Sequence, residues 1–239
     1  LQDAGSQAIA ECGAARRGER VIDFCAGAGG KTLALAARMR NQGQVLAFDT
    51  DEARLSRLGP RLKRASVDIV TQMRLKDSTD ARLARYQGWA DLVLVDAPCS
   101  GSGTLRRHPD LKWRLQPQEV AHYRQLQRQI MAAAARLLRP GGRLVYATCS
   151  LLADENEAQM AWLAHKAGGV SAAGGAAGAA GAAERAADPT GSGGAVGAGG
   201  VQATDPAWPA VSLQPVAQRY WLPQPEGGDV FFMASWTRA

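Results

Sequence analysis

Two cysteines stand where a parallel sheet would present them to a ligand. Cys99 follows an apolar run at residues 92–95 and the tripeptide Asp96-Ala97-Pro98. Cys149 directly follows a second run, at residues 143–148. If the two runs form neighbouring strands, both thiols face one cleft, because ligands bind at the carboxyl ends of parallel strands. A lone cysteine at a strand end is more often a small buried residue than a nucleophile. Two of them at neighbouring strand ends are difficult to explain by packing alone.

A glycine-rich turn after an earlier apolar run is a candidate nucleotide site. The turn runs from Cys25 to Gly30, and the next apolar run stops at Asp49, about 20 residues further on. Such glycines let the backbone approach a ligand, and the acid binds the ribose hydroxyls. Asp51 is a rival acid, and Asp49 is preferred because it stands directly at the strand end.

Three cofactor classes compete for this turn. A nicotinamide site needs GxGxxG, and the chain supplies Gly27 and Gly29 but has Thr32 in the third position. A phosphate loop needs GxxxxGK[ST], and its opening glycine is replaced by Cys25. S-adenosylmethionine needs only a tight glycine turn and an acid, so the turn by itself favours it modestly. A turn that merely packs a helix on the sheet remains an alternative.

The two cysteines favour a methyl donor. Carbon 5 of a pyrimidine is a poor nucleophile until a thiolate adds to carbon 6. A thiol beside a cofactor with a transferable methyl group is therefore a sensible pairing for pyrimidine methylation. A nucleotide-dependent oxidoreductase explains the glycine turn and Asp49, but it does not explain Cys99 and Cys149.

Strands and helices must alternate to position these residues, and the hydrophobic pattern predicts that they do. The runs that predict strands before residue 167 are residues 21–24, 45–48, 67–73, 92–95 and 143–148. The stretches that predict helices are residues 31–39, 51–64, 118–138 and 154–166. Residues 220–222 and 230–234 predict a closing pair of strands. This order predicts an α/β fold with a doubly wound, mostly parallel sheet.

One segment differs in composition from the rest. Residues 167–203 consist mostly of alanine and glycine and contain no aromatic residue. Such a segment buries too little apolar surface to offset its loss of conformational entropy, so we predict a flexible insertion. It would separate a catalytic core at residues 1–166 from C-terminal strands at residues 204–239 that complete the same domain.

Composition narrows the class of protein. The net charge is +6, and 23 of the 28 basic residues are arginine. Either coding bias or a polyanionic partner would explain this excess of arginine over lysine. No run approaches the roughly 18 apolar residues of a membrane span. The four cysteines include no CxxC pair, which excludes a zinc ribbon and a small disulfide scaffold. We expect a cytoplasmic protein with neither a membrane nor a metal partner.

The motifs, taken together, resemble the Nop/Sun (RsmB-like) family of S-adenosylmethionine-dependent RNA cytosine-5 methyltransferases. The segments that carry the resemblance, in family order, are residues 1–7, 23–32, 96–100, 146–150 and 229–234. Within the family, residues 106–113 are most similar to the bacterial members that act on 16S rRNA. The resemblance implies a Rossmann-like class I methyltransferase sheet with an antiparallel closing strand, and S-adenosylmethionine as cofactor.

The resemblance also implies roles for individual residues. Cys149 would add to carbon 6 of the cytosine, and Cys99 would assist release of the methylated base. Asp96 would share a proton near ring nitrogen 3, Asp49 would bind the ribose, and Asp77 would meet the adenine. The residues expected to hold the cofactor are Cys25, Ala26, Gly27, Ala28, Gly29, Gly30, Lys31, Asp49, Asp77 and Asp96.

A cluster of cations beside an aromatic residue follows the Cys99 loop and predicts an RNA contact. Its members are Arg106, Arg107, His108, Lys112 and Trp113. Cations bind phosphate and a tryptophan stacks on unpaired bases, although a solvated charged loop is the alternative. The target cytosine must be unpaired or flipped out, because its carbon is inaccessible in a stacked helix.

The expected partner is RNA, with ribosomal RNA first. A transfer-RNA methyltransferase of the same family and a catalytically silent RNA-binding module remain alternatives. Relatives of this kind carry an N-terminal RNA-recognition region ahead of the segment that begins at Leu1. We therefore expect a catalytic domain that binds RNA weakly or unselectively by itself.

Overall fold

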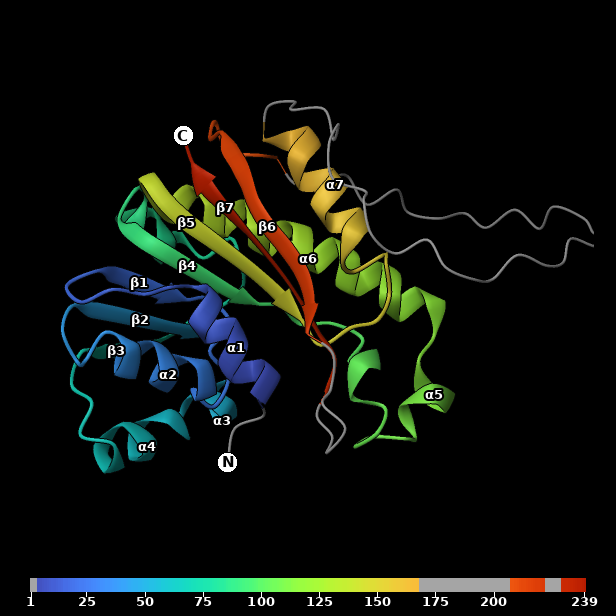
Figure 1. Cartoon of the computed structure of the whole chain (residues 1–239), viewed down its shortest axis with the longest axis horizontal. Helices are drawn as coiled ribbons and strands as arrows, with labels where there is room; N and C mark the ends of the chain where they lie inside the picture. The colour runs from blue at the N-terminus through green and yellow to red at the C-terminus, as the bar shows by residue number, and fades with distance from the viewer. Residues whose placement is uncertain (1–3, 168–206, 222–228) are drawn as a thin grey trace, which may run out of the picture.

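A seven-stranded sheet forms the centre of the molecule, in the order β3-β2-β1-β4-β5-β7-β6 (Figure 1). The computed structural model describes residues 4–167, 207–221 and 229–239. The strands are β1 (Arg20–Asp23), β2 (Gln44–Asp49), β3 (Val70–Arg74), β4 (Ala90–Asp96), β5 (Leu138–Thr148), β6 (Leu213–Trp221) and β7 (Phe231–Arg238). Strands β1 to β5 pair in parallel, and β7 pairs antiparallel with both β5 and β6. The predicted fold class is confirmed, including its antiparallel closing strand.

Helices cover both faces of the sheet (Figure 1). They are α1 (Ala4–Cys12), α2 (Gly30–Arg38), α3 (Glu52–Leu55), α4 (Leu58–Arg64), α5 (Leu111–Arg114), α6 (Pro117–Leu137) and α7 (Glu157–Lys166), with 3-10 turns η1 (Ala81–Tyr86) and η2 (Ser102–Thr104). Helices α1 and α2 pack together on one face, and α6 packs on β4 and β5 from the other. The central strands β1, β2 and β4 are therefore mostly buried between two helical layers, whereas the edge strands β3 and β6 are largely exposed.

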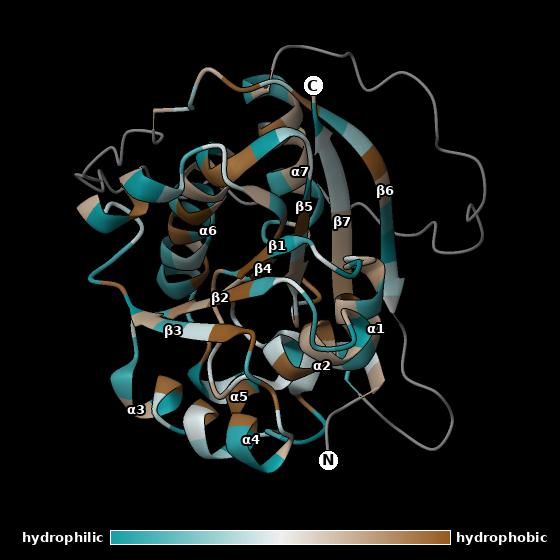
Figure 2. Cartoon of the chain, turned by 90° about the vertical axis from the view of Figure 1, so that its left-hand side faces the viewer, coloured by the Kyte–Doolittle hydropathy of each residue, from teal (hydrophilic) through white to brown (hydrophobic). Residues whose placement is uncertain are grey.

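Burial on both faces explains the sequence of the central strands. Every residue of the run Leu92–Val95 in β4 is fully buried, as expected for a strand covered on both sides. Figure 2 shows the same contrast, with mostly hydrophobic residues along the central strands and hydrophilic residues on the outer surfaces of the helices.

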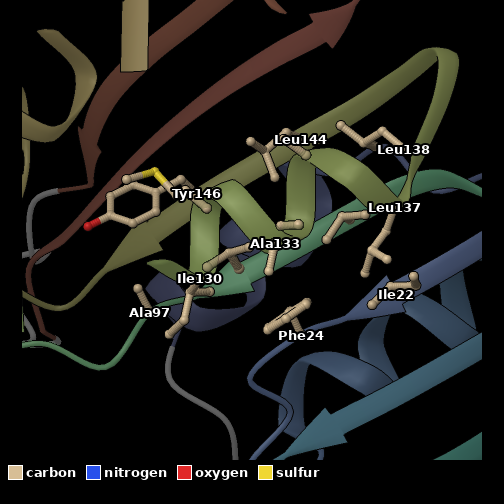
Figure 3. Close-up of a cluster of buried hydrophobic side chains, with 14 of the residues drawn as sticks. Ile22, Phe24, Ala97, Ile130, Ala133, Leu137, Leu138, Leu144 and Tyr146 are labelled. Atoms are coloured by element: carbon tan, nitrogen blue, oxygen red, sulfur yellow. The ribbon is translucent and has the colours of Figure 1, made fainter. Parts of the chain in front are cut away.

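Helix α6 is positioned by a defined start and by a small-residue face. Pro117 occupies its first turn, and Gln116 and Glu119 form a capping box that satisfies free backbone N–H groups. Its buried alanines, 132–135, allow a close approach to the sheet. Figure 3 shows Ile130, Ala133 and Leu137 of this helix beside Leu144 and Tyr146 of β5. Strand β5 begins directly after the helix, five residues earlier than predicted from the sequence.

The single helix predicted over residues 51–64 is wrong, because the structure has two. Helix α3 ends at Leu55 and α4 begins at Leu58. Pro60 lies in the first turn of α4, where its missing N–H costs nothing, whereas a continuous helix would place its ring against the carbonyl of Ser56. The leucines expected to share one side, Leu55, Leu58 and Leu62, do pack in one buried cluster.

The predicted insertion at residues 167–203 lies outside the described residues, apart from Ala167. On the far side of that gap, β6 and β7 join the same sheet as β5. Among the described residues, no helix is long and apolar enough to cross a membrane.

The order of the strands determines where a ligand can bind. From β1 the chain proceeds outward through β2 and β3, and from β4 it proceeds outward in the other direction through β5. Such a switch point opens a crevice at the carboxyl ends of the two central strands. The loops after β1 and β4 lie at this crevice, and both were singled out from the sequence.

Candidate active site

A cavity of about 720 Å³ lies at the carboxyl ends of β1 to β5. Its lining includes most of the predicted cofactor residues: Cys25, Ala26, Gly27, Ala28, Gly30, Lys31, Asp49, Asp77 and Asp96. Gly29 is the one member of the predicted set that does not line it. Both Cys99 and Cys149 do. The structure therefore places the nucleotide-like turn and the two thiols in one cavity.

The glycine turn has a different requirement at each of two positions. Gly27 has φ +54°, and nothing lies within 4 Å of the place where a β-carbon would stand. Its side of the turn is open to the cavity. Gly29 has φ +81° and caps α2, and a β-carbon there would collide with Leu58 Cδ1. Gly27 therefore leaves room for a ligand, whereas Gly29 lets the turn pack on α4.

Asp49 ties the turn to the end of β2. Its Oδ2 accepts a hydrogen bond from the Gly27 N–H at 2.7 Å, and its Oδ1 accepts one from the Asp51 N–H at 2.8 Å. Asp51 also lines the cavity, but its side chain caps α3 and pairs with Arg54 at 3.3 Å. The carboxyl of Asp49 is thus oriented toward the glycine turn, as the preference for it over Asp51 requires.

Asp77 lies in the loop after β3 and lines the cavity. Its Oδ1 accepts hydrogen bonds from the Thr79 N–H at 2.7 Å and from the Thr79 hydroxyl at 2.5 Å. These bonds hold the pKa of the exposed Asp77 carboxyl below its ordinary value. Asp77 thus organises its own turn while facing the cavity.

An ion pair lies between the glycine turn and the thiols. Lys31 Nζ is 2.5 Å from Asp96 Oδ2, and the ammonium also lies 5.9 Å from the centre of the Phe231 ring. Lys31 is almost fully buried, although it lines the cavity. The pair places one cation and one carboxyl beside any ring that enters between the two sides of the cavity.

The two thiols are in contact. Cys99 Sγ and Cys149 Sγ are 3.4 Å apart. A hydrogen bond from Cys99, with help from the charge of Lys31, lowers the pKa of Cys149. The same hydrogen bond, together with burial, raises the pKa of Cys99 well above its ordinary value. These shifts favour Cys149 as the thiol that ionises first and Cys99 as the donor of the shared hydrogen bond.

A third cavity cysteine shows that this behaviour is specific to the pair. Cys25 also lines the cavity. Burial and the charges of Asp96, Asp23 and Asp49 raise its pKa well above the ordinary value. Of the three thiols at the cavity, Cys149 alone is activated toward the thiolate.

Several cavity residues were not singled out from the sequence. Tyr123, Leu126, Gln129 and Ile130 of α6 form one wall. Their spacing predicts one face of a helix, but nothing in the sequence indicates that this face of α6 lines the cavity.

Asp23, at the end of β1, is fully buried and does not line the cavity. Burial raises the pKa of its carboxyl to about 7.

The predicted RNA-binding residues lie outside the cavity lining, on the segment that leads from the Cys99 loop to α5. Arg106 and His108 are exposed. Trp113 is 75% exposed, and Lys112 Nζ lies 4.9 Å from the centre of its ring. Arg107 instead binds Asp229, with Nε 3.0 Å from Oδ1, and Asp229 is buried. Arg107 therefore contacts a buried residue of the fold.

Among the described residues, no three His, Cys, Asp or Glu side chains come close enough to hold a metal ion.

Curated bacterial proteins are similar to this chain in sequence. The "Ribosomal RNA small subunit methyltransferase B" of Klebsiella pneumoniae is 42% identical over 166 residues, which cover 67% of this chain and 37% of that protein. The protein of the same description from Salmonella heidelberg is 41% identical over 162 residues, with the same coverage. The chain thus spans about 37% of the length of these curated relatives.

Solved structures superpose over nearly the whole chain. The crystal structure of PH0851 matches with a TM-score of 0.71 at 30% identity, and covers 99% of this chain and 46% of its own. The structure of NSun6 from Pyrococcus horikoshii with SFG matches with a TM-score of 0.70 at 24% identity, and covers 99% and 52%. The second likeness shows a shared fold.

The family described as 16S rRNA methyltransferase RsmB/F matches residues 12–237. That span contains the glycine turn, the Lys31–Asp96 pair, both thiols and the closing strands. The chain therefore belongs to the RsmB/F methyltransferase family.

Proposed function

We propose that this chain transfers a methyl group to carbon 5 of a cytosine in RNA through a covalent adduct on Cys149. The observation that carries the proposal is the thiol pair, because the sulfur atoms of Cys149 and Cys99 lie 3.4 Å apart in the cavity that the glycine turn also lines. Methyl transfer to an oxygen or an exocyclic nitrogen requires no such pair. Methylation of a pyrimidine carbon requires a nucleophile that attacks and then leaves.

S-adenosylmethionine is the methyl donor of this family, and the cavity fits it. A β-carbon at Gly27 would occupy open space at the cavity, where the cofactor would otherwise approach the backbone, and the φ of +54° suits glycine. Asp49 at the end of β2 and Asp77 in the loop after β3 both line the cavity, and they would bind the ribose hydroxyls and the adenine, respectively. When bound there, the cofactor supplies an electrophilic methyl group.

Cys149 carries the first step in this mechanism. Its thiolate forms a bond to carbon 6 of the cytosine, and the π electron pair of the 5,6 double bond moves onto carbon 5, which becomes nucleophilic. The hydrogen bond that lowers the pKa of Cys149 raises the fraction of thiolate available for this attack. The Lys31–Asp96 pair stands beside the cavity and would offset charge at ring nitrogen 3 and share a proton there.

Cys99 acts in the release step. After methylation of carbon 5, a solvent water accepts the proton from that carbon, and the electron pair of the C5–H bond re-forms the double bond while the C6–S bond breaks. Cys149 recovers its electron pair as a thiolate. Cys99 lies in contact with that sulfur and stabilises it by donating a hydrogen bond.

The proposed substrate is ribosomal RNA of the small subunit. Two curated relatives at 41–42% identity are described as ribosomal RNA small subunit methyltransferases. The exposed cations Arg106, His108 and Lys112, with Trp113 beside them, offer contacts for phosphate and for an unpaired base. A ribosomal substrate would place the reaction in the cytoplasm. Transfer RNA is the second substrate that the test below includes.

The experiment is a trapping assay with three cysteine variants. The chain and its Cys149→Ser, Cys99→Ser and Cys12→Ser forms are incubated with labelled S-adenosylmethionine and either small-subunit ribosomal RNA or transfer RNA. Cys12 serves as the matched control because it is part-buried near Met233, away from the cavity. Methyl transfer is measured by nucleoside analysis, and adducts are detected on a denaturing gel.

The proposal expects Cys149→Ser to give neither product nor adduct and Cys99→Ser to accumulate the adduct. Cys12→Ser should behave as the wild type. An adduct that accumulates in Cys149→Ser instead would exchange the two roles. If no form transfers a methyl group to either RNA while S-adenosylhomocysteine binds, the activity fails for this chain and a silent RNA-binding module is favoured.

A further inference from the structure

A cluster of buried polar side chains lies behind the two thiols. Ser100 follows Cys99 and Ser150 follows Cys149, and each serine is at most 5% exposed. Glu155 and Gln127 complete the cluster, and both are fully buried. None of the four lines the cavity. The cluster is therefore part of the scaffold that carries the thiols and does not face a ligand.

The carboxyl of Glu155 joins the two cysteine loops. Its Oε1 accepts a hydrogen bond from the Ser100 N–H at 2.8 Å, and its Oε2 accepts one from the Ser100 hydroxyl at 2.5 Å. The same Oε2 accepts a hydrogen bond from the Ser150 hydroxyl at 2.5 Å. One side chain thus holds the residue after each thiol.

Gln127 of α6 extends this hold to the other side of Cys99. Its Nε2 donates to Glu155 Oε1 at 3.1 Å and to the carbonyl of Pro98 at 3.0 Å. Pro98 and Ser100 flank Cys99, so the backbone on both sides of this cysteine is fixed. The contact at 3.4 Å between the thiols depends on that placement.

A buried carboxyl is costly unless every lone pair finds a donor. Glu155 finds its donors at the two loops that carry Cys99 and Cys149 and on α6, which fixes one loop relative to the other. We propose that Glu155 is a positioning residue of the methyl-transfer reaction, a buried clamp that holds Cys99 against Cys149. Its consequence for turnover rests on the function proposed above, whereas its effect on the thiols does not.

The clamp has a consequence for the chemistry of Cys149. The hydrogen bond from Cys99 is the main cause that lowers the pKa of Cys149. If the loops separate, this hydrogen bond is lost and the pKa of Cys149 rises. At a given pH, less thiolate is then available, and the thiol reacts more slowly with an alkylating agent.

Two substitutions of Glu155 distinguish the loss of its hydrogen bonds from the loss of its charge. Glu155→Ala removes all four hydrogen bonds. Glu155→Gln retains them, because Oε2 accepts only from hydroxyl groups, and these can turn to accept from an amide N–H. Glu157→Gln is the matched control, since Glu157 is exposed at the start of α7 and binds the Tyr220 hydroxyl.

The test measures two properties of the full chain. The first is the rate of iodoacetamide alkylation of Cys149 from pH 6 to 10, followed by mass spectrometry of its peptide. The second is kcat and KM for RNA methylation, with S-adenosylhomocysteine affinity and the thermal unfolding midpoint as checks on folding. For Glu155→Ala we expect the alkylation midpoint to move to higher pH and kcat to fall about a hundredfold, with cofactor affinity unchanged. Glu155→Gln should recover the wild-type midpoint and most of kcat, and Glu157→Gln should change neither.

A wild-type alkylation profile in folded Glu155→Ala would overturn the clamp, whatever its turnover. Failure of Glu155→Gln to restore the profile, with S-adenosylhomocysteine still bound, would overturn the assignment to these hydrogen bonds. If the wild type methylates no cytosine, the proposed function fails, and the alkylation profiles still decide whether Glu155 holds the thiols together.

Discussion

The two sides of the cavity are built in different ways. On the cofactor side, the turn from Cys25 to Gly30 meets Asp49, and the hydrogen bond from Gly27 to Asp49 spans 22 residues of sequence. Asp49 also binds the backbone only two residues further on, at Asp51. On the thiol side, Ser100 binds Glu155 across 55 residues and Arg107 binds Asp229 across 122. The backbone of the cofactor turn is therefore held by contacts of shorter sequence separation, whereas the thiol side is assembled by side-chain contacts across longer separations.

This difference teaches what each side tolerates. A backbone cradle depends on φ angles and on the absence of a β-carbon, as at Gly27 and Gly29. An assembled site depends on buried polar groups, each of which must find its partner. Substitutions should therefore affect one side of the cavity while leaving the other intact.

The largest expected effect concerns Asp23, which lies beneath the cofactor side. Burial raises the pKa of this carboxyl from 3.8 to about 7, against the lowering effects of the Thr32 hydroxyl and Lys31. Between these values the folded chain keeps a proton that the unfolded chain has released. The stability from this group is thus present below pH 4 and is lost as the pH rises through about 7, by about 4 kcal/mol in total.

Asp23→Asn should flatten this dependence, because the amide does not titrate and its oxygen can still accept from the Thr32 hydroxyl. Urea unfolding at intervals from pH 4.5 to 8 measures the slope. Asp51→Asn, an exposed acid at the same cavity, serves as the control and should keep the wild-type slope. Parallel curves for wild type and Asp23→Asn would show that Asp23 does not carry the pH dependence.

The next effect is confined to the thiol side. Gly103 donates its N–H to the carbonyl of Cys149 at 2.9 Å, and a β-carbon would stand 2.5 Å from the Val230 carbonyl oxygen and 2.9 Å from that of Cys149. These are backbone atoms that cannot swing aside. Gly103→Ala should therefore displace Cys149 and lower kcat about a hundredfold.

Affinity for S-adenosylhomocysteine, measured by calorimetry, should stay at the wild-type value in Gly103→Ala, since the glycine turn is untouched. Gly59→Ala in α4 is the control, because a β-carbon there meets only ordinary contact, with Gln72 at 3.6 Å. Equal losses of turnover and of cofactor affinity would contradict the independence of the two sides.

A third effect separates fold from RNA binding on the thiol side. Asp229 is 1% exposed and pairs with Arg107, so Arg107→Ala leaves a buried carboxyl without its cation. We expect a loss of about 2 kcal/mol in the free energy of unfolding, less than for a fully buried pair because Arg107 itself is half-exposed. Arg106→Ala, the exposed neighbour, should leave stability unchanged, as chemical denaturation can measure. Equal stability of the two variants would show that the pair with Asp229 does not stabilise the fold.

The same division explains what could be predicted from the sequence. The glycine turn and Asp49 follow from residues close together in the chain, and the apolar run Leu92–Val95 identified the strand that precedes the Cys99 loop. The placement of Cys99 and Cys149 in one cavity followed from one assumption, that β4 and β5 are neighbours, which the strand order confirms. Their direct contact was not predicted.

Side-chain partners over long separations could not be predicted in this way. Glu155 stands in an acidic stretch with Asp154 and Glu157, both of which are exposed, and composition does not say which of the three turns inward. Arg107 belongs to a run of cations, and its pairing with Asp229 depends on where β7 enters the sheet. The break between α3 and α4 was missed for another reason. The leucine spacing continues from one helix into the next, whereas the helical backbone hydrogen bonds are interrupted between Leu55 and Leu58.

The smallest effect on the fold is expected at Trp113, which belongs to neither side. Its ring is 75% exposed and contacts the ammonium of Lys112, so Trp113→Ala should change the free energy of unfolding by less than about 0.5 kcal/mol. If the ring stacks on an unpaired base, the substitution should weaken RNA binding by about 1 kcal/mol or more, and Trp113→Phe should recover much of it. Filter binding with single-stranded RNA, with the exposed Leu151→Ala as control, measures this. Unchanged RNA affinity would leave the cations to bind phosphate without a stacking partner, and the RNA path would then have to follow charge alone.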